Sequence, residues 1–238
     1  MFPFNSNSTQ SAAIAKLFNL EIVIAALILA LVTTWVIIVV VRFRHRPERG
    51  EPAQVEGNRW LEITWTASPI ILLLVLFGYT LQAMAAADPT VPAATPADLV
   101  VVGHQWWWEV HYPQSNVVTA NEIHIPVGKR LLVEVTSADV IHSFWIPALS
   151  RKADMIPTRS QRLWLQADKA GDYAGSCAEF CGAEHAWMRL RVVAQPPDEF
   201  EQWLAAQAQP APVPSSGDAA QGAQLFQERT CRNCHAIA

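Results

Sequence analysis

Charge is scarce in this sequence of 238 residues. Only 16% of the residues are charged, 51% are hydrophobic, and the formal net charge is −4. A weak negative balance speaks against a nucleic-acid-binding protein, and so little charge is unusual for a soluble globule and indicates a membrane protein. Cysteine is scarce as well. The four cysteines fall in two close pairs, each with a cofactor role open to it, so no disulfide framework is required.

Charge is absent altogether from two long runs, residues 22–41 and residues 63–84. At 1.5 Å per residue, a helix of this length spans about 30 Å, which is the thickness of the bilayer hydrocarbon. A buried helix of a soluble core is the alternative, and this length disfavours it. We therefore predict an N-terminal segment (1–18) followed by a transmembrane hairpin (19–86), with spans over about 20–42 and 63–84.

The basic residues indicate how this hairpin is oriented. Five arginines lie at the inner ends of the two runs and in the loop between them, and no Lys or Arg follows until Lys129: Arg42, Arg44, Arg46, Arg49 and Arg59. The positive-inside rule places this loop in the cytoplasm. We expect both termini on the periplasmic or outer side of a bacterial plasma membrane.

Beyond a Pro-rich linker (85–97), the chain changes to short runs of alternating apolar and polar residues. The predicted strand segments are 99–112, 122–126, 130–136, 162–167 and 185–193, and turn residues stand between them. Many short strands of this kind predict a β-sandwich or β-barrel over residues 97–195. A short helix (196–208) and a Pro/Ser-rich linker (209–217) follow.

Metal-binding residue types gather between Gly175 and Met188. Cys177, Cys181, His185 and Met188 lie within this segment, and His142 precedes it. Thiolate and thioether ligands favour copper, zinc or iron–sulfur, and a thioether beside thiolate and imidazole indicates copper. Two cysteines four residues apart can bridge two copper ions that share one electron hole. Such a site suits electron transfer, because no coordination position has to stay open.

Two other interpretations of this segment remain. Its four donor residues are also spaced like one face of a helix, and Cys177 and Cys181 could form a disulfide outside the cell. Gly175 and Gly182 favour a loop over a continuous helix.

The pattern C-x-E-x-C-G-x-x-H-x-x-M, preceded by H-S-F-W-x-P, resembles the dinuclear copper A centre of cytochrome c oxidase subunit II. The resemblance implies a cupredoxin-like Greek-key β-barrel. It also implies two copper ions held by His142, Cys177, Glu179, Cys181, His185 and Met188, with Glu179 contributing its backbone carbonyl. The Glu179 side chain would bind magnesium at the interface with subunit I.

Three further segments resemble the same family. In GHQWWWEVHY, Trp106 would be the point at which electrons arrive. On a strand, Trp106 and Trp108 would share one face and Trp107 would take the other. Packing in the core or at the membrane edge is the alternative role for these tryptophans. In LEITWTASP, Glu62 would serve proton uptake, or be an ordinary interfacial carboxylate. In RKADMIPTR, the charged Lys152, Asp154 and Arg159 would face subunit I and its haem propionates, or form surface ion pairs; Thr158 replaces the family's glycine.

The C-terminal segment carries a second cofactor signal. Cys231, Cys234 and His235 form C-x-x-C-H, the attachment signal of a c-type haem, with a zinc or disulfide CxxC as the alternative. The preceding G-x-x-x-F run resembles the first helix of class I cytochromes c. We therefore predict that residues 218–238 begin an all-α cytochrome c domain of a longer, haem-c-fused chain.

The resemblance implies subunit II of a terminal respiratory cytochrome c oxidase of bacterial type. It would accept electrons from cytochrome c and pass them to haem in subunit I, where oxygen is reduced to water and protons are pumped. Expected partners are subunit I, subunit III, cytochrome c and membrane lipid. A copper subunit of a nitric oxide reductase and a membrane-anchored copper-binding or copper-delivery protein are the alternatives, whereas a quinol oxidase subunit II would lack the copper ligands. An acidic face could steer a basic cytochrome c, although scattered surface acids are the default explanation: Glu109, Glu122, Asp139, Asp168, Asp172 and Glu184.

Overall fold

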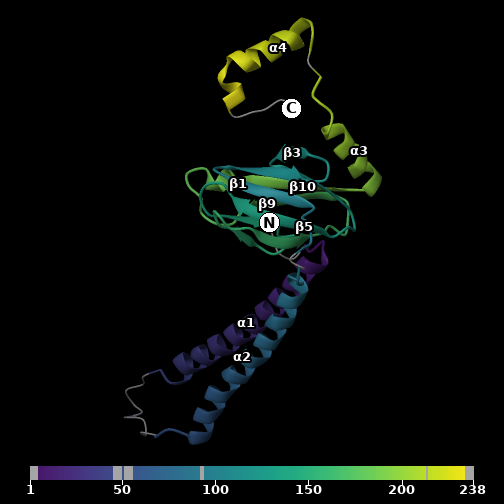
Figure 1. Ribbon diagram of the computed structural model, residues 1–238. Coiled ribbons are helices and arrows are strands. Elements are labelled where there is room, and N and C mark those ends of the chain that lie inside the picture. Colours follow the sequence, from purple (N-terminus) through teal and green to yellow (C-terminus); the bar gives the residue numbers. More distant parts are fainter. Residues whose placement is uncertain (1–4, 45–49, 51–55, 92–93, 213, 234–238) are drawn as a thin grey trace.

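The computed structural model describes residues 5–44, 50, 56–91, 94–212 and 214–233. Figure 1 shows a long helical hairpin that extends from one side of a β domain, with short C-terminal helices on the other side. Of the loop between the two long helices, residues 45–49 and 51–55 lie outside the described residues, and so do Arg46 and Arg49 of the predicted cytoplasmic cluster.

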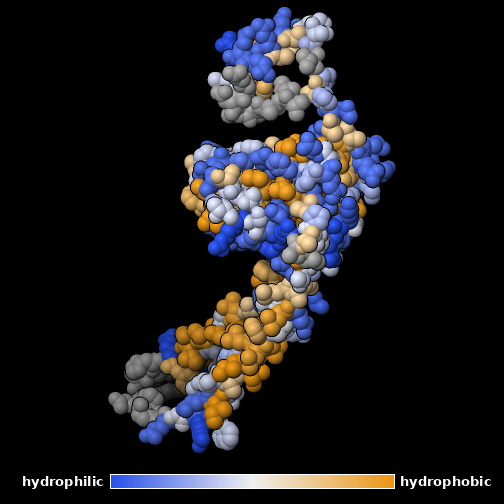
Figure 2. Space-filling view, in the orientation of Figure 1, coloured by the Kyte–Doolittle hydropathy of each residue, from blue (hydrophilic) through white to orange (hydrophobic). Residues whose placement is uncertain are grey.

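The hairpin consists of α1 (Thr9–Arg42) and α2 (Arg59–Ala87), which lie side by side and antiparallel (Figure 1). Both helices are long and apolar enough to cross a membrane. Their large aliphatic and aromatic side chains are exposed, and they give the hairpin a continuous hydrophobic surface in Figure 2. Within α2, the helix continues through Pro69. The predicted spans are confirmed as helices. Helix α1 begins earlier than predicted and ends at the predicted Arg42, whereas α2 extends beyond both predicted ends.

The N-terminal residues are fastened to the β domain. Ser8 caps α1 in a capping box with Ser11, and its hydroxyl donates to the carbonyl of Leu149 at 2.6 Å. The hydroxyl of Ser11 donates to the carbonyl of Ala148 at 2.7 Å. Residues 1–18 were predicted as a segment separate from the hairpin. This boundary is wrong from Thr9 onward, because the Ser8 cap starts the helix well before the apolar run.

In the part of the chain that the structure describes, ten strands form two five-stranded sheets. The first sheet has the order β3-β2-β1-β5-β8: β3 Val117–Ala120, β2 Trp107–Tyr112, β1 Leu99–His104, β5 Leu131–Ser137 and β8 Gln161–Leu165. The second has the order β4-β10-β9-β6-β7: β4 Glu122–Pro126, β10 Arg189–Gln195, β9 Gly171–Cys177, β6 His142–Trp145 and β7 Ala153–Met155. The β1–β5 and β4–β10 pairs are parallel, and the remaining pairs are antiparallel.

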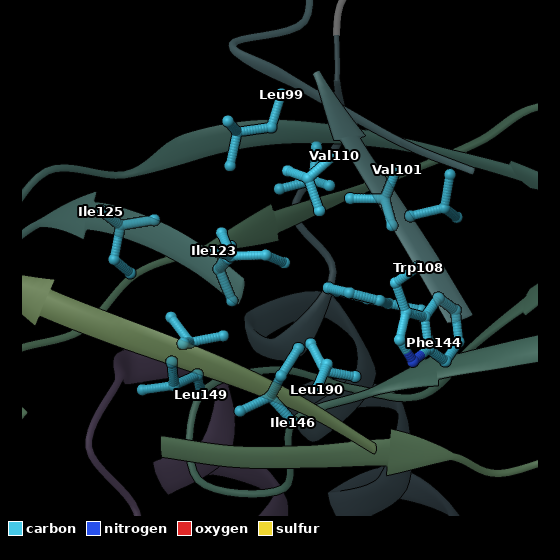
Figure 3. Close-up of a cluster of buried hydrophobic side chains, with 14 of the residues drawn as sticks. Leu99, Val101, Trp108, Val110, Ile123, Ile125, Phe144, Ile146, Leu149 and Leu190 are labelled. Atoms are coloured by element: carbon cyan, nitrogen blue, oxygen red, sulfur yellow. The ribbon is translucent and has the colours of Figure 1, made fainter. Parts of the chain in front are cut away.

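The sheets pack face to face over one hydrophobic core, so the domain is a cupredoxin-like β-sandwich. Inward and outward residues alternate along β1 and β2, as the sequence pattern predicts. Figure 3 shows the centre of this core, to which strands of both sheets contribute: Leu99, Val101, Trp108, Val110, Ile123, Ile125, Phe144, Ile146, Leu149 and Leu190. The strand pattern left a β-sandwich and a β-barrel open, and the resemblance implied a Greek-key barrel; the described strands form the sandwich, with two separate sheets.

Two predicted strand segments are interrupted. The run 99–112 divides into β1 and β2 at a turn formed by Gln105 and Trp106. We had expected Trp106 and Trp108 to share one strand face. This expectation is wrong, because Trp106 lies in the turn and not on a strand. Trp108 is fully buried, and Trp107 is 37% exposed. In the last segment, His185–Trp187 form a 3₁₀ helix (η2), and β10 begins only at Arg189.

The helix predicted at 196–208 is confirmed as α3 (Pro197–Gln207). Trp203 stacks on the imidazole of His124, with ring centroids 3.8 Å apart, and its edge meets the ring of Tyr112. Helix α4 (Gly217–Glu228) and a 3₁₀ helix, η3 (Thr230–Asn233), follow and lie away from the β domain (Figure 1). Cys231 is an exposed free thiol in η3, whereas Cys234 and His235 lie outside the described residues.

Candidate metal centre

The predicted donor residues meet where several strands of the second sheet begin or end. His142 is the first residue of β6, Cys177 is the last residue of β9, and Met188 directly precedes β10. Since β6 and β9 are antiparallel neighbours that pair Phe144 with Cys177, His142 is brought to the end of β9 where the cysteine loop begins. The sheet register therefore joins residues that are far apart in sequence.

Each cysteine sulfur has one imidazole beside it. The sulfur of Cys177 lies 3.8 Å from Nδ1 of His142 and 3.2 Å from the backbone carbonyl oxygen of Glu179. The sulfur of Cys181 lies 3.5 Å from Nδ1 of His185. The donor atoms of His142, Cys177 and Cys181 all lie within 4.8 Å of one another.

Met188 completes the donor set. Its thioether sulfur lies 3.7 Å from the sulfur of Cys181, and its side chain is fully buried. For bonds of about 2.0–2.3 Å in a tetrahedral site, two donor atoms on one ion lie about 3.5 Å apart. The measured separations match that value. With two thiols, two imidazoles, a thioether and a backbone carbonyl, the residues fit copper.

The two alternative interpretations of this segment are wrong. Cys177 and Cys181 are free thiols, so they form no disulfide. The segment is a strand end, a loop and a 3₁₀ turn, so it is not a helical stripe. Burial, together with the neighbouring Cys177, raises the pKa of the Cys181 thiol to about 12. A bound metal ion therefore has to displace the thiol protons.

Asp139 orients His142, a role that the sequence did not reveal. Its Oδ1 lies 2.8 Å from Nε2 of His142, which leaves Nδ1 toward Cys177. The backbone N–H groups of Gln105 and Val140 also donate to the carboxylate, at 2.7 and 2.6 Å. Burial opposes ionisation of Asp139, but these hydrogen bonds outweigh it and hold the pKa of the carboxyl below its ordinary value. Carboxylates that fix a metal-binding imidazole in this way tune metal affinity.

The turn between β1 and β2 lies against the cysteine loop. Trp106 donates its indole N–H to the carbonyl of Cys181 at 3.1 Å, and Gln105 donates its side-chain amide to the same oxygen at 2.7 Å. Phe180 and Trp187, on the same loop, are 75% and 78% exposed. The side chain of Glu179 is exposed too. Trp106 is therefore the aromatic residue of the tryptophan run that touches the metal-binding loop directly.

The charged residues predicted to face subunit I lie around the edge strand β7, which pairs with β6: Lys152 directly precedes β7, Asp154 lies on it, and Arg159 follows it. Asp154 accepts a hydrogen bond from the hydroxyl of Ser143, the residue that follows His142. Lys152 and Arg159 are exposed. Thr158 adopts φ of +67°, so the turn keeps a left-handed residue where the resemblance expects glycine. Glu62 lies in the first turn of α2, at the end of the hairpin far from the metal-binding loops (Figure 1).

Most of the acids considered for an acidic face are engaged in hydrogen bonds or ion pairs. Glu109 lies between His104 and His111, with N–O distances of 2.8 and 2.7 Å. The other paired acids are Glu122 with His124 and Arg191, Asp172 with Arg191, Asp168 with Gln166, and Asp139 with His142. Arg191 thus compensates the charges of Glu122 and Asp172, whereas the other acids have imidazole or amide partners.

Both the helical hairpin and the β domain are similar to known proteins. The family model described as "Cytochrome C oxidase subunit II, transmembrane domain" matches residues 2–83, and "Cytochrome C oxidase subunit II, periplasmic domain" matches residues 115–195. Cytochrome c oxidase subunit 2 of Alkalihalophilus pseudofirmus is 38% identical, over 92% of this chain and 65% of the relative. The same subunit of Thermostichus vulcanus is 31% identical, over 82% of this chain and 75% of the relative.

Quinol oxidase subunit 2 of Bacillus cereus is also similar, with 32% identity over 79% of this chain and 66% of the relative. The chain spans about three fifths of the length of several of these curated relatives. The transmembrane-domain match takes in most of both long apolar helices, so the chain is a membrane protein. From these matches and from the donor residues that the sandwich brings together, we conclude that the chain belongs to the cytochrome c oxidase subunit II family.

Proposed function

We propose that this chain is the copper-bearing subunit II of a bacterial haem–copper oxidase. It accepts electrons from cytochrome c and delivers them to haem in subunit I, where oxygen is reduced to water and protons are pumped. The observation that carries the proposal is the complete donor set, in which each buried cysteine has its own imidazole neighbour. A single copper would require only one of the cysteines.

Cys177 and Cys181 would hold two copper ions together with His142, His185, Met188 and the carbonyl of Glu179. Copper would supply one-electron chemistry here. The protein holds the donors in place. His142 is fully buried and bonded to Asp139, and Met188 is fully buried in the core. Donors that cannot move keep the structural change on electron transfer small.

Trp106 is the proposed point at which electrons arrive. Its indole is hydrogen-bonded to the carbonyl of Cys181, so an aromatic ring is connected to a copper ligand through one hydrogen bond and a few covalent bonds. The exposed rings of Phe180 and Trp187 lie on the same loop and give a donor protein an apolar surface to contact. Docking through apolar contacts agrees with the finding that most of the acids considered for an acidic face already have partners within the domain.

The remaining roles follow the architecture. The apolar hairpin would anchor the chain in the plasma membrane beside subunit I and subunit III, with the arginine loop in the cytoplasm. Lys152, Asp154 and Arg159 would face subunit I, and Glu179 would bind magnesium at that interface. Glu62 lies at the cytoplasmic end of α2 in this orientation, where it could serve proton uptake.

Haem c would be attached to Cys231 and Cys234, with His235 as the iron ligand. The exposed free thiol of Cys231 supports this, because thioether formation requires an accessible thiol. Haem that remains on the chain in a denaturing gel, and that is lost with Cys231→Ala, is the expected result. A chain matured with haem available that carries none would refute the assignment.

Three other functions could use the same architecture. A quinol oxidase subunit would not need the copper donors, which are all present here. A copper-delivery protein would bind one copper and would not need two cysteine–imidazole pairs. A nitric oxide reductase subunit would share the donor set, and only the gas that the assembled complex consumes separates the two.

Electron paramagnetic resonance of the full chain in detergent, loaded with copper, tests the proposal. We expect about two coppers per chain and a many-line hyperfine pattern from one electron shared over two ions. His185→Ala should convert this pattern into the four-line signal of a single copper or abolish it. A four-line signal from the unaltered chain would show that the donor set binds one copper, and the delivery function would then be preferred.

A further inference from the structure

One residue of the β1–β2 turn contacts both loops that carry the copper donors. The backbone N–H of Gln105 donates to Oδ2 of Asp139 at 2.7 Å, and Asp139 holds His142. The side-chain amide of Gln105 donates to the carbonyl of Cys181, also at 2.7 Å. Gln105 therefore connects the β5–β6 loop with the β9–β10 loop.

This connection lies at the outer part of the site. At the base, sheet hydrogen bonds already fix the donors: the N–H of Ala178 donates to the carbonyl of Ser143 at 2.9 Å, and that of Cys177 to the carbonyl of Met188 at 3.0 Å. Cys181 lies four residues beyond Cys177 and belongs to no strand. The two hydrogen bonds to its carbonyl come from Gln105 and Trp106.

The fit between the turn and the cysteine loop leaves no spare space. Gly182 has φ of +118°, and a Cβ at this position would lie 2.9 Å from Nε2 of Gln105 and 3.2 Å from the ring of Trp106. Glycine at this position lets the turn and the cysteine loop approach each other, and the two hydrogen bonds to the Cys181 carbonyl hold them together. Removing the amide would remove one of the two hydrogen bonds that hold the Cys181 carbonyl to the turn.

We propose that Gln105 is a positioning residue, which holds the Cys181 sulfur and the His142 imidazole at a fixed separation by bonding to both donor loops. This inference rests on the proposed copper site. A dinuclear centre needs the donors of both loops at once. A variable distance between the two loops would therefore weaken the binding of both copper ions. Partners that orient metal ligands typically change metal affinity about 10–100-fold when they are removed.

Gln105→Met in the full chain tests this role, because methionine keeps the length of the side chain and removes the amide donor. Gln166→Met is the matched control. Gln166 also donates its amide to a single acceptor, Asp168 at 2.8 Å, but in an exposed position away from the donor loops. Three quantities are compared: the thermal midpoint of the copper-free chain, the hyperfine pattern of the copper-loaded chain, and the rate of copper loss to a chelator.

We expect the two copper-free variants to unfold at similar temperatures. Gln105→Met should lose copper about 10-fold faster than Gln166→Met and should show a broadened or split hyperfine pattern. Equal copper loss and equal spectra in the two variants would overturn the positioning role. A lower thermal midpoint with an unchanged spectrum would overturn it too, since Gln105 would then only stabilise the fold. If Gln166→Met itself shows no two-copper pattern, the proposed function fails before the inference is reached.

Discussion

Gly103, on β1, faces the imidazole of His142 at a distance that leaves no room for a side chain. A Cβ at this position would lie 2.9 Å from Cδ2, 3.1 Å from Cγ and 3.4 Å from Cβ of His142. Carbon atoms pack most favourably at about 3.5–4.0 Å. Gly103→Ala therefore has to move either the ring or the strand by several tenths of an ångström.

Neither can move freely. The ring of His142 is fully buried, bonded to Asp139 at 2.8 Å, and in edge contact with the ring of Trp108 at a centroid distance of 6.0 Å. Strand β1 lies between β2 and β5 and is hydrogen-bonded to both. An added methyl group in so closed a site costs about 1–3 kcal/mol. For a β domain of about 100 residues, this lowers the unfolding midpoint by roughly 4–24 °C.

Thermal unfolding of the full chain in detergent, followed by tryptophan fluorescence, measures the loss. Gly222→Ala, on α4, is the control, because a Cβ at that position meets no atom within 4 Å. We expect the control to unfold like the unaltered chain, and Gly103→Ala to unfold earlier and to bind copper with an altered spectrum. An unchanged midpoint together with an unchanged copper spectrum would refute the claim that the His142 ring needs the space left by glycine at position 103.

Three further substitutions probe the rest of the chain. Ser8→Ala removes the cap of α1 and the bond to Leu149, and should destabilise the junction of hairpin and β domain by about 1–3 kcal/mol, seen as faster proteolysis there. Tyr112 donates to the carbonyl of His124 and accepts from its N–H, and burial raises the pKa of its phenol. A raised pKa in the folded state gives stability that is complete below about pH 10 and is lost as the pH rises further. Tyr112→Phe should therefore cost about 1–3 kcal/mol at pH 7 in urea unfolding, and show a shallower decline above pH 10. Thr158→Gly should keep or slightly raise the unfolding midpoint, since relief of about 1–2 kcal/mol from the left-handed φ exceeds the entropy cost of glycine.

The donor residues were predictable because their chemistry is local. Cys177, Cys181, His185 and Met188 lie close together in sequence, and few functions other than metal binding need those residue types at that spacing. The hairpin was predictable for a similar reason, because an uncharged run long enough to cross a bilayer has few other uses. The ends of the two hairpin helices were less predictable, because the start of α1 depends on the Ser8 cap and its contact with the β domain.

The orienting residues were not predictable. Asp139 could be seen only as one surface acid among several, because its bond to His142 depends on the path of the loop between β5 and β6. The position of Trp106 depended on where the chain turns between β1 and β2, and three adjacent tryptophans do not mark that position. Alternation along the strands fixes which side chains face inward, but it does not decide whether the sheet edges close into a barrel or remain two sheets.

The close contacts at three glycines were the features of the site that the sequence predicted least. Gly175 and Gly182 indicated a loop, yet Gly175 lies within β9, where a Cβ would meet Leu190 at 2.7 Å and the carbonyl oxygen of Trp145 at 2.9 Å. At Gly103 and Gly182 the same missing atom leaves space for a donor residue and for Gln105. Each of these glycines thus lets one segment of the site approach another more closely than any other residue would allow. The absence of side chains at these positions therefore shapes the centre as directly as the ligands do, and replacing a glycine should disturb the copper site without touching any donor.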